Sequence, residues 1–425
     1  MRRITPSNYN NRIPQTMEKI TLDANVASRK RIFFIVLFVC IGLAGLVYGF
    51  THLGGNKKGW QRITLDKYGV ENCSYDFTLS YYLGSGKQSV NKERNRLIEC
   101  YQRLTTHAYR IFDRDKLYEG IGNVCYVNQN VNREITVDPV LYQALLSFEQ
   151  KGNREIYTCA LSEHYDALIR IDSLSALPEV DPYSSEEVAA FFQTVAEFAA
   201  DPEMVSLEFL SNNRLILHVS EAYLTYAKDN DIRSFIDFGW MKNAYIVDYL
   251  TENLCKEGFT KGILSSYDGF TRNFADLTEE YRYELYLRTE KGSFPAATLA
   301  YNGTGVFVNM RDYPLWSFDE FRFLSIPDGT IRNTYINPED GRCEVSMHDM
   351  LTYQLGGDLS CSEIMLSAMP LYLCDSVSRE VAEAKLSAAG IGLVTEEEYK
   401  IIISGGLRVV SVLEREDVRF FAETR

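Results

Sequence analysis

Apolar and polar positions alternate with two different spacings along this chain, and the spacings predict a region that mixes helices with strands. Apolar residues three and four positions apart predict helices over 91–112, 137–148 and 187–200. Short apolar runs predict strands over 75–83, 262–266, 297–301 and 305–310, and a hairpin of 205–210 with 214–219. Interleaved helices and strands without an internal repeat indicate an α+β or mixed α/β fold class.

One stretch joins a predicted strand to a predicted helix at a glycine turn. Residues 232–238 are short and apolar enough for a strand, and helical spacing begins near Met241 after the turn at Gly239. The start of a helix presents free amide groups, so Asp237 would lie beside them and a ligand would bind there. A polar turn residue with no ligand would give the same pattern.

The order of residues 237–248 resembles a known sequence element. It matches the Asp-Leu-Gly-Gly-x-x-Lys-Gly-Tyr-x-x-Asp pattern of the ApbE family, the FAD-dependent FMN transferases that attach flavin to exported proteins. The matching positions are Asp237, Gly239, Tyr245 and Asp248. The differing positions are Trp240 for the second glycine, Asn243 for the lysine and Ala244 for the third glycine. Further landmarks follow in the family's order over most of residues 75 to 420.

This resemblance implies an ApbE-like flavin transferase fold with FAD as its ligand. The cofactor-binding residues that it implies are Tyr118, Tyr157, Thr158, Asp237, Gly239 and Asn243. Thr158 stands where the family has an aspartate, and Thr334 where it has a histidine. Tyr118 and Tyr157 are equally explained as core aromatics in a chain with 28 tyrosines. No catalytic residue is assigned.

The resemblance also implies a magnesium site on the FAD diphosphate. The family places an aspartate and a threonine one helical turn apart, and Glu363 and Ser367 take these positions here. A spacing of four puts both on one helix face, and both offer oxygen ligands to a hard cation. Trp240 is assigned to the same Mg²⁺ site. The alternative is that Ser360 and Glu363 form a capping box, which needs no metal.

Charge and hydropathy predict where the chain resides. The net charge of −14 disfavours nucleic acid as a partner. Residues 32–50 lack charge, proline and histidine, and they follow the basic run 29–31, which predicts a membrane anchor with a cytoplasmic N-terminus. A cleaved signal peptide is the alternative. The predicted organisation is a cytoplasmic tail 1–31, a transmembrane anchor 32–50 in the cell membrane, a linker 51–60 and an extracytoplasmic ApbE-like domain 61–425.

Cysteine usage neither requires a disulfide nor indicates a zinc site. Eight cysteines outside 32–50 permit disulfides, but none forms the Cys-x-x-Cys spacing of a zinc site.

The resemblance leaves two hypotheses for the function. The first is a protein that binds FAD and transfers FMN to a Ser or Thr of an exported flavoprotein acceptor. The second is an inactive pseudoenzyme that serves as an interaction module in the cell envelope.

Overall fold

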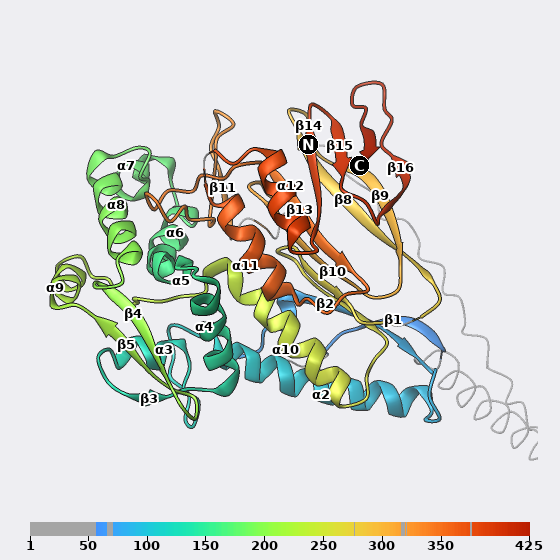
Figure 1. The fold of residues 1–425 in the computed structure, drawn as a ribbon, viewed down its shortest axis with the longest axis horizontal. Coiled ribbons are helices and arrows are strands. Elements are labelled where there is room, and N and C mark those ends of the chain that lie inside the picture. The colour runs from blue at the N-terminus through green and yellow to red at the C-terminus, as the bar shows by residue number, and fades with distance from the viewer. Residues whose placement is uncertain (1–56, 66–70, 276, 316–318, 320, 375) are drawn as a thin grey trace, which may run out of the picture. The chain divides into compact units, whose positions relative to one another are not determined.

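Nine strands of the described residues form one sheet at the centre of the fold (Figure 1). All neighbouring strands pair antiparallel except β15 and β17, which are parallel. In spatial order the strands are β1 (Gly59–Ile63), β2 (Phe77–Leu83), β6 (Gly262–Ser266), β7 (Phe270–Asn273), β10 (Gly305–Arg311), β13 (Asp349–Leu355), β14 (Gly392–Glu397), β15 (Lys400–Ile403) and β17 (Phe421–Thr424).

The computed structural model describes residues 57–65, 71–275, 277–315, 319, 321–374 and 376–425. Lys58–Arg425 forms one compact unit, distinct from Met1–Lys57. All features discussed below lie in the Lys58–Arg425 unit.

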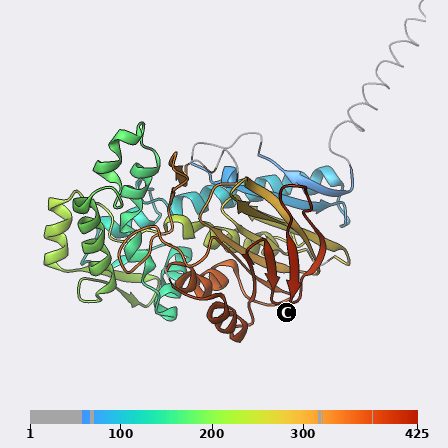
Figure 2. The same ribbon diagram turned by 90° about the horizontal axis from the view of Figure 1, so that it is seen from above.

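Both faces of the central sheet are covered, by different kinds of structure (Figures 1 and 2). Helices α2 (Val90–Ile111), α10 (Lys242–Lys256) and α11 (Cys361–Tyr372) pack on one face, and α12 (Arg379–Ala388) packs against α11. The opposite face carries a smaller sheet of β16 (Arg408–Val412), β9 (Gly292–Asn302) and β8 (Glu280–Thr289). Side chains alternate along β10, so Val308 joins the helix-side core and Phe307 the sheet-side core.

Between α2 and α10 the chain builds a mainly helical region at one end of the unit, drawn in green in Figure 1. Its helices are α3 (Val124–Gln129), α4 (Pro139–Lys151), α5 (Glu155–Thr158), α6 (Ser162–Ile169), α7 (Leu177–Val180), α8 (Glu186–Ala200) and α9 (Glu221–Asp229). A small sheet of β3 (Ile135–Thr136), β5 (Arg214–Val219) and β4 (Val205–Leu210) completes it. The remaining elements are β11 (Phe323–Ser325), β12 (Ile331–Asn333) and the 3₁₀ turns η1 (Ser74–Asp76), η2 (Cys159–Leu161), η3 (Leu174–Ala176) and η4 (Gly239–Met241).

The predicted elements are confirmed except at one segment. Helices 91–112, 137–148 and 187–200 appear as α2, α4 and α8, and the predicted hairpin is β4 and β5. Residues 232–238 do not form a strand. The Asn128 side chain takes the place of a neighbouring strand, because its Oδ1 accepts from the amides of Phe235 and Ile236 and its Nδ2 donates to the Ile236 carbonyl.

The predicted localisation as a single-pass membrane protein is corrected by the structure. Within the described ranges, no helix is both long enough and apolar enough to cross a bilayer. The longest of these, α2, has polar residues along one side and buries residues such as Leu97 and Leu104 against the core. Segment 32–50, on which the prediction rested, lies outside the described residues. The eight cysteines that the structure describes are free thiols.

A buried carboxyl group at the start of β13 makes stability depend on pH. Asp349 accepts a 2.6 Å hydrogen bond from the Tyr313 hydroxyl, and burial raises the pKa of Asp349 from 3.8 to about 8. Between pH 3.8 and about 8, Asp349 is ionised in the unfolded chain and protonated in the folded protein, so folding takes up a proton. The contribution of this group to stability is therefore full below pH 3.8 and is lost as pH rises through about 8.

We expect Asp349→Asn, which cannot ionise, to remove this pH dependence. Its free energy of unfolding should exceed that of the wild type by about 1 kcal/mol or more at pH 9 and should not exceed it at pH 4. Urea denaturation across this range measures the difference. Asp358→Asn, at an exposed loop position, is the control and should keep the wild-type profile. Parallel pH profiles for Asp349→Asn and the wild type would contradict the assignment.

Candidate functional site

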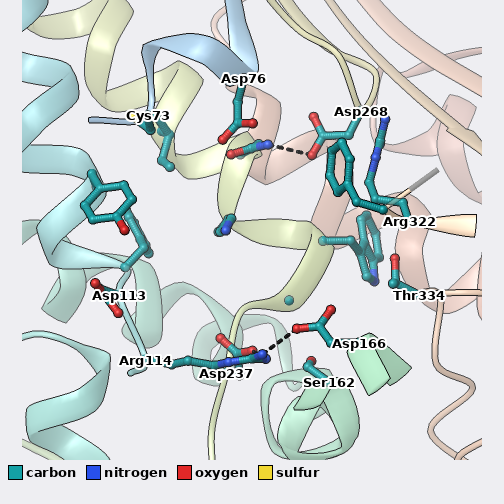
Figure 3. Close-up of a pocket in the computed structure, with 18 of the residues that line it drawn as sticks. Cys73, Asp76, Asp113, Arg114, Ser162, Asp166, Asp237, Asp268, Arg322 and Thr334 are labelled. Atoms are coloured by element: carbon teal, nitrogen blue, oxygen red, sulfur yellow. Dashed lines mark hydrogen bonds and ion pairs between the residues drawn. The ribbon is translucent and has the colours of Figure 1, made fainter. Parts of the chain in front are cut away.

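A cavity of about 880 Å³ lies where α2 ends and α10 begins, beside α6 and the turn between β6 and β7 (Figure 3). This volume lies within the range of small-molecule and cofactor sites. The aromatic residues that line it are Tyr75, Tyr109, Phe112, Tyr165, Trp240, Tyr267 and Phe321. Its charged lining residues are Asp76, Asp113, Asp115, Asp166, Asp237, Asp268, Arg114, Arg170, Lys242 and Arg322. The lining is thus both aromatic and rich in carboxylates.

Asp237 lies in this cavity, where an arginine holds it (Figure 3). Arg114 Nη1 contacts Asp237 Oδ2 at 2.8 Å, and Arg114 Nη2 contacts Asp166 Oδ2 at 2.5 Å. Only 7% of the Asp237 side chain is exposed. The two carboxylates raise the pKa of Arg114 against the opposing effect of its burial. Asp237 is therefore a paired structural acid as well as a lining residue.

Gly239 is required by the shape of the turn. Its φ of +50° lies in the left-handed region, and a Cβ there would lie 3.1 Å from Ser162 Oγ and 3.3 Å from Cys159 Sγ. The backbone thus passes close over α6 and η2. This close approach brings Trp240 and the start of α10 to the cavity wall, where Trp240 stacks on Phe270 at 6.3 Å between ring centres.

Asp268 lies on the side of the cavity opposite Arg114 (Figure 3), and it is paired with Asn243. Asn243 Nδ2 donates to Asp268 Oδ2 at 2.7 Å. The other oxygens of this pair, Asn243 Oδ1 and Asp268 Oδ1, are buried without a hydrogen-bond partner. Asp76 lies nearby at the end of η1, and burial raises the pKa of its carboxyl to about 6, while Lys242 lowers it and Asp268 raises it further.

Two cations of this wall were not assigned from the sequence. Lys242, at the first position of α10, lines the cavity and is exposed, directly before the position where the family pattern has its lysine. Arg322 is fixed by an ion pair with the fully buried Asp319 and donates to the Tyr267 carbonyl at 3.1 Å. The pattern supplied a signal for Lys242, since it is one residue from Asn243. No local pattern in the sequence marks Arg322 or Arg114.

Three of the implied cofactor residues lie outside the cavity lining. Tyr118 donates its hydroxyl at 2.7 Å to Asp113, which does line the cavity. Tyr157 is buried beneath Arg154, whose guanidinium carbon lies 4.6 Å from the ring centre. Thr158 is buried beside it in α5. The Ile156 carbonyl in the same segment accepts a hydrogen bond from the Asp237 amide at 3.0 Å, so this segment holds the backbone of the Asp237 turn in place.

The implied magnesium residues are engaged in helix capping. Glu363 Oε2 accepts from the Ser360 amide at 2.8 Å, Ser360 Oγ accepts from the Glu363 amide at 3.2 Å, and the Ser367 hydroxyl donates to the Glu363 carbonyl at 2.8 Å. These side chains do not line the cavity. In the described part of the chain, no cluster of three His, Cys, Asp or Glu residues is arranged to hold a metal. Glu363 and Ser367 thus do not fit a magnesium ion in this geometry, and the indole of Trp240 offers it no acceptor.

The fold and the cavity define a protein with a cofactor-sized site at the start of a helix, beside a sheet covered on both faces. Solved structures of ApbE proteins share this architecture. The chain is similar to flavin transferase ApbE from Vibrio cholerae, with 12% identity, a TM-score of 0.52 and coverage of 83% of this chain and 97% of that chain. It is equally similar to the ApbE protein from Thermotoga maritima, with 12% identity, a TM-score of 0.51 and the same coverage.

At this identity the likeness establishes the fold. The chain has an ApbE-like α+β fold, as the sequence resemblance predicted. No family model and no curated protein sequence matches the chain.

Proposed function

We propose that the protein binds FAD in the cavity beside Asp237. The observation that carries this proposal is that residues 237–243, which bear the ApbE-like sequence pattern, also form one wall of the cavity. The fold that surrounds this wall is that of known flavin transferases. The same segment therefore links the sequence resemblance, the fold and a site of adequate size.

The lining offers suitable partners to the planar rings and the diphosphate of FAD. Trp240, Tyr109 and Phe321 line the cavity, and aromatic side chains of this kind are suited to contact a planar ring system. Lys242 and Arg322 supply positive charge for the diphosphate, and the start of α10 adds the favourable end of the helix dipole. Arg114 is held by two carboxylates and so contributes less free charge.

Transfer of FMN from FAD to an acceptor protein is the reaction that this binding mode would serve. An acceptor Ser or Thr oxygen would attack the phosphorus of the FMN half, and the bond from that phosphorus to the bridging oxygen would break. AMP would leave with the electron pair, and the hydroxyl proton would pass to solvent. Within this chain, the aromatic wall and the two cations would orient the diphosphate for in-line attack.

One observation favours the second candidate, an interaction module without transfer activity. Glu363 and Ser367, at the positions where the family holds magnesium, are already hydrogen-bonded within α11. A protein that had lost transfer would need these residues only for the helix.

Calorimetric titration of FAD into the full chain tests the proposal. We expect saturable binding that weakens about tenfold, or about 1.4 kcal/mol, in Lys242→Gln, because a charge beside the diphosphate is removed. Lys256→Gln removes the exposed lysine at the other end of the same helix and serves as the control, with unchanged affinity. Absence of FAD binding, or equal loss in both variants, would reject this site. Release of AMP from bound FAD in the presence of cell-envelope proteins would distinguish transfer from binding alone.

A further inference from the structure

Two buried oxygen atoms without a hydrogen-bond partner, Asn243 Oδ1 and Asp268 Oδ1, belong to one corner of the cavity. Asp76 lies close to Asp268 in this corner (Figure 3). Asn243 is 6% exposed and Asp268 is 8% exposed, and one oxygen of each has no hydrogen-bond partner. The Asp76 carboxylate lines the same space and forms no salt bridge with a described residue. Burying such oxygens unpaired costs about 1 to 3 kcal/mol for each group, so a ligand that pairs with them would be favoured here.

The three side chains come from different elements that are fixed relative to one another. The Tyr267 amide donates to the Asp76 carbonyl at 3.0 Å, which ties η1 to the turn that carries Asp268. Gly269 holds that turn with a φ of +108°, and a Cβ there would lie 2.1 Å from the Asn309 carbonyl oxygen. Asn243 is anchored by its position in the first turn of α10. The backbone positions of the three residues are therefore fixed relative to one another.

The chemistry of the corner selects for a cation. Ionised carboxylates only accept hydrogen bonds, and the Asn243 amide already uses one donor on Asp268. Two carboxylates that face each other repel, and Lys242 acts on Asp76 from a distance without a salt bridge between these two described residues. Magnesium is commonly bound through one or two carboxylates, with water and substrate phosphates completing its shell. Two carboxylates and an amide oxygen match this pattern.

We propose that Asp76, Asp268 and Asn243 bind a divalent cation of the magnesium type, at a site separate from Glu363 and Ser367. This inference rests on the proposed FAD site in one respect, that phosphate oxygens of FAD would complete the shell. The cation would also offset negative charge in the cavity. Six aspartates and four cationic side chains line the cavity, and the incoming diphosphate is itself an anion. A cation in this corner would reverse the local repulsion.

Manganese, followed by electron paramagnetic resonance, serves as the probe for magnesium. We expect the full chain to bind one Mn²⁺ in competition with Mg²⁺, and to bind it more tightly when FAD is present. Asp76→Asn and Asp268→Asn should each weaken Mn²⁺ binding at least tenfold. Both changes keep the shape of the side chain, and circular dichroism and thermal unfolding check that each variant is folded.

Two matched variants separate this site from its alternatives. Asp115→Asn neutralises an exposed carboxylate of the same cavity and should leave Mn²⁺ affinity unchanged. Glu363→Gln tests the position implied by the resemblance and should also have no effect. Loss of Mn²⁺ binding in Glu363→Gln but not in Asp268→Asn would overturn the proposal, as would absence of Mn²⁺ binding with and without FAD. An FAD affinity that is equal with and without Mn²⁺ would overturn the shared cation site and leave the FAD site standing.

Discussion

Replacement of Arg114 by leucine is expected to lower the free energy of unfolding by about 2 to 4 kcal/mol at neutral pH. Arg114 contacts two carboxylates at once, those of Asp237 and Asp166, and only 17% of its side chain is exposed. Its removal leaves Asp237 buried without its counter-ion and places two like charges near each other.

Urea denaturation at pH 7.5 measures this effect. Arg233→Leu is a matched control, since Arg233 also contacts two acids, Asp231 and Glu163, but 69% of its side chain is exposed. Its stability should equal that of the wild type, because exposed pairs are screened by solvent. If the two variants lose the same stability, the buried bridge does not hold the Asp237 turn.

Asp248→Ala is expected to destabilise the fold by about 3 to 5 kcal/mol. Asp248 is 7% exposed and accepts from the amides of Cys361 at 2.9 Å and Ser362 at 2.8 Å. Arg272 adds a contact of 3.3 Å. Removal of the carboxylate leaves two buried amides at the start of α11 without an acceptor, and the Arg272 charge loses its partner.

Chemical denaturation measures the loss, and hydrogen exchange at residues 361 and 362 locates it. Ser378→Ala removes an ordinary N-cap from α12, where Ser378 accepts from the Val381 amide at 3.5 Å, and should cost about 1 kcal/mol or less. Comparable losses in the two variants, or unchanged exchange at the start of α11, would show that Asp248 does not carry this junction.

The fate of Asp248 explains why a sequence motif does not specify a site residue by residue. Asp237 and Asp248 belong to one pattern, yet Asp237 lines the cavity and Asp248 is turned toward α11. The intervening residues form a 3₁₀ turn and then the first turns of α10, which rotate successive side chains to different sides. Glu363 and Ser367 do share a helix face as predicted, but local hydrogen bonds already engage both.

The sequence by itself determined most helices and strands, and it determined the one wall of the cavity that residues 237–243 form. Local patterns were sufficient for α2, α8, the β4–β5 hairpin and the glycine turn, because spacing, caps and turn residues act within a few positions. The tertiary structure alone decided the rest of the site. Arg114 contacts Asp237, and Asp76 lies within electrostatic reach of Asp268, only because the sheet and α10 bring distant segments together. Burial then decides which charges are paired and which oxygens have no hydrogen-bond partner.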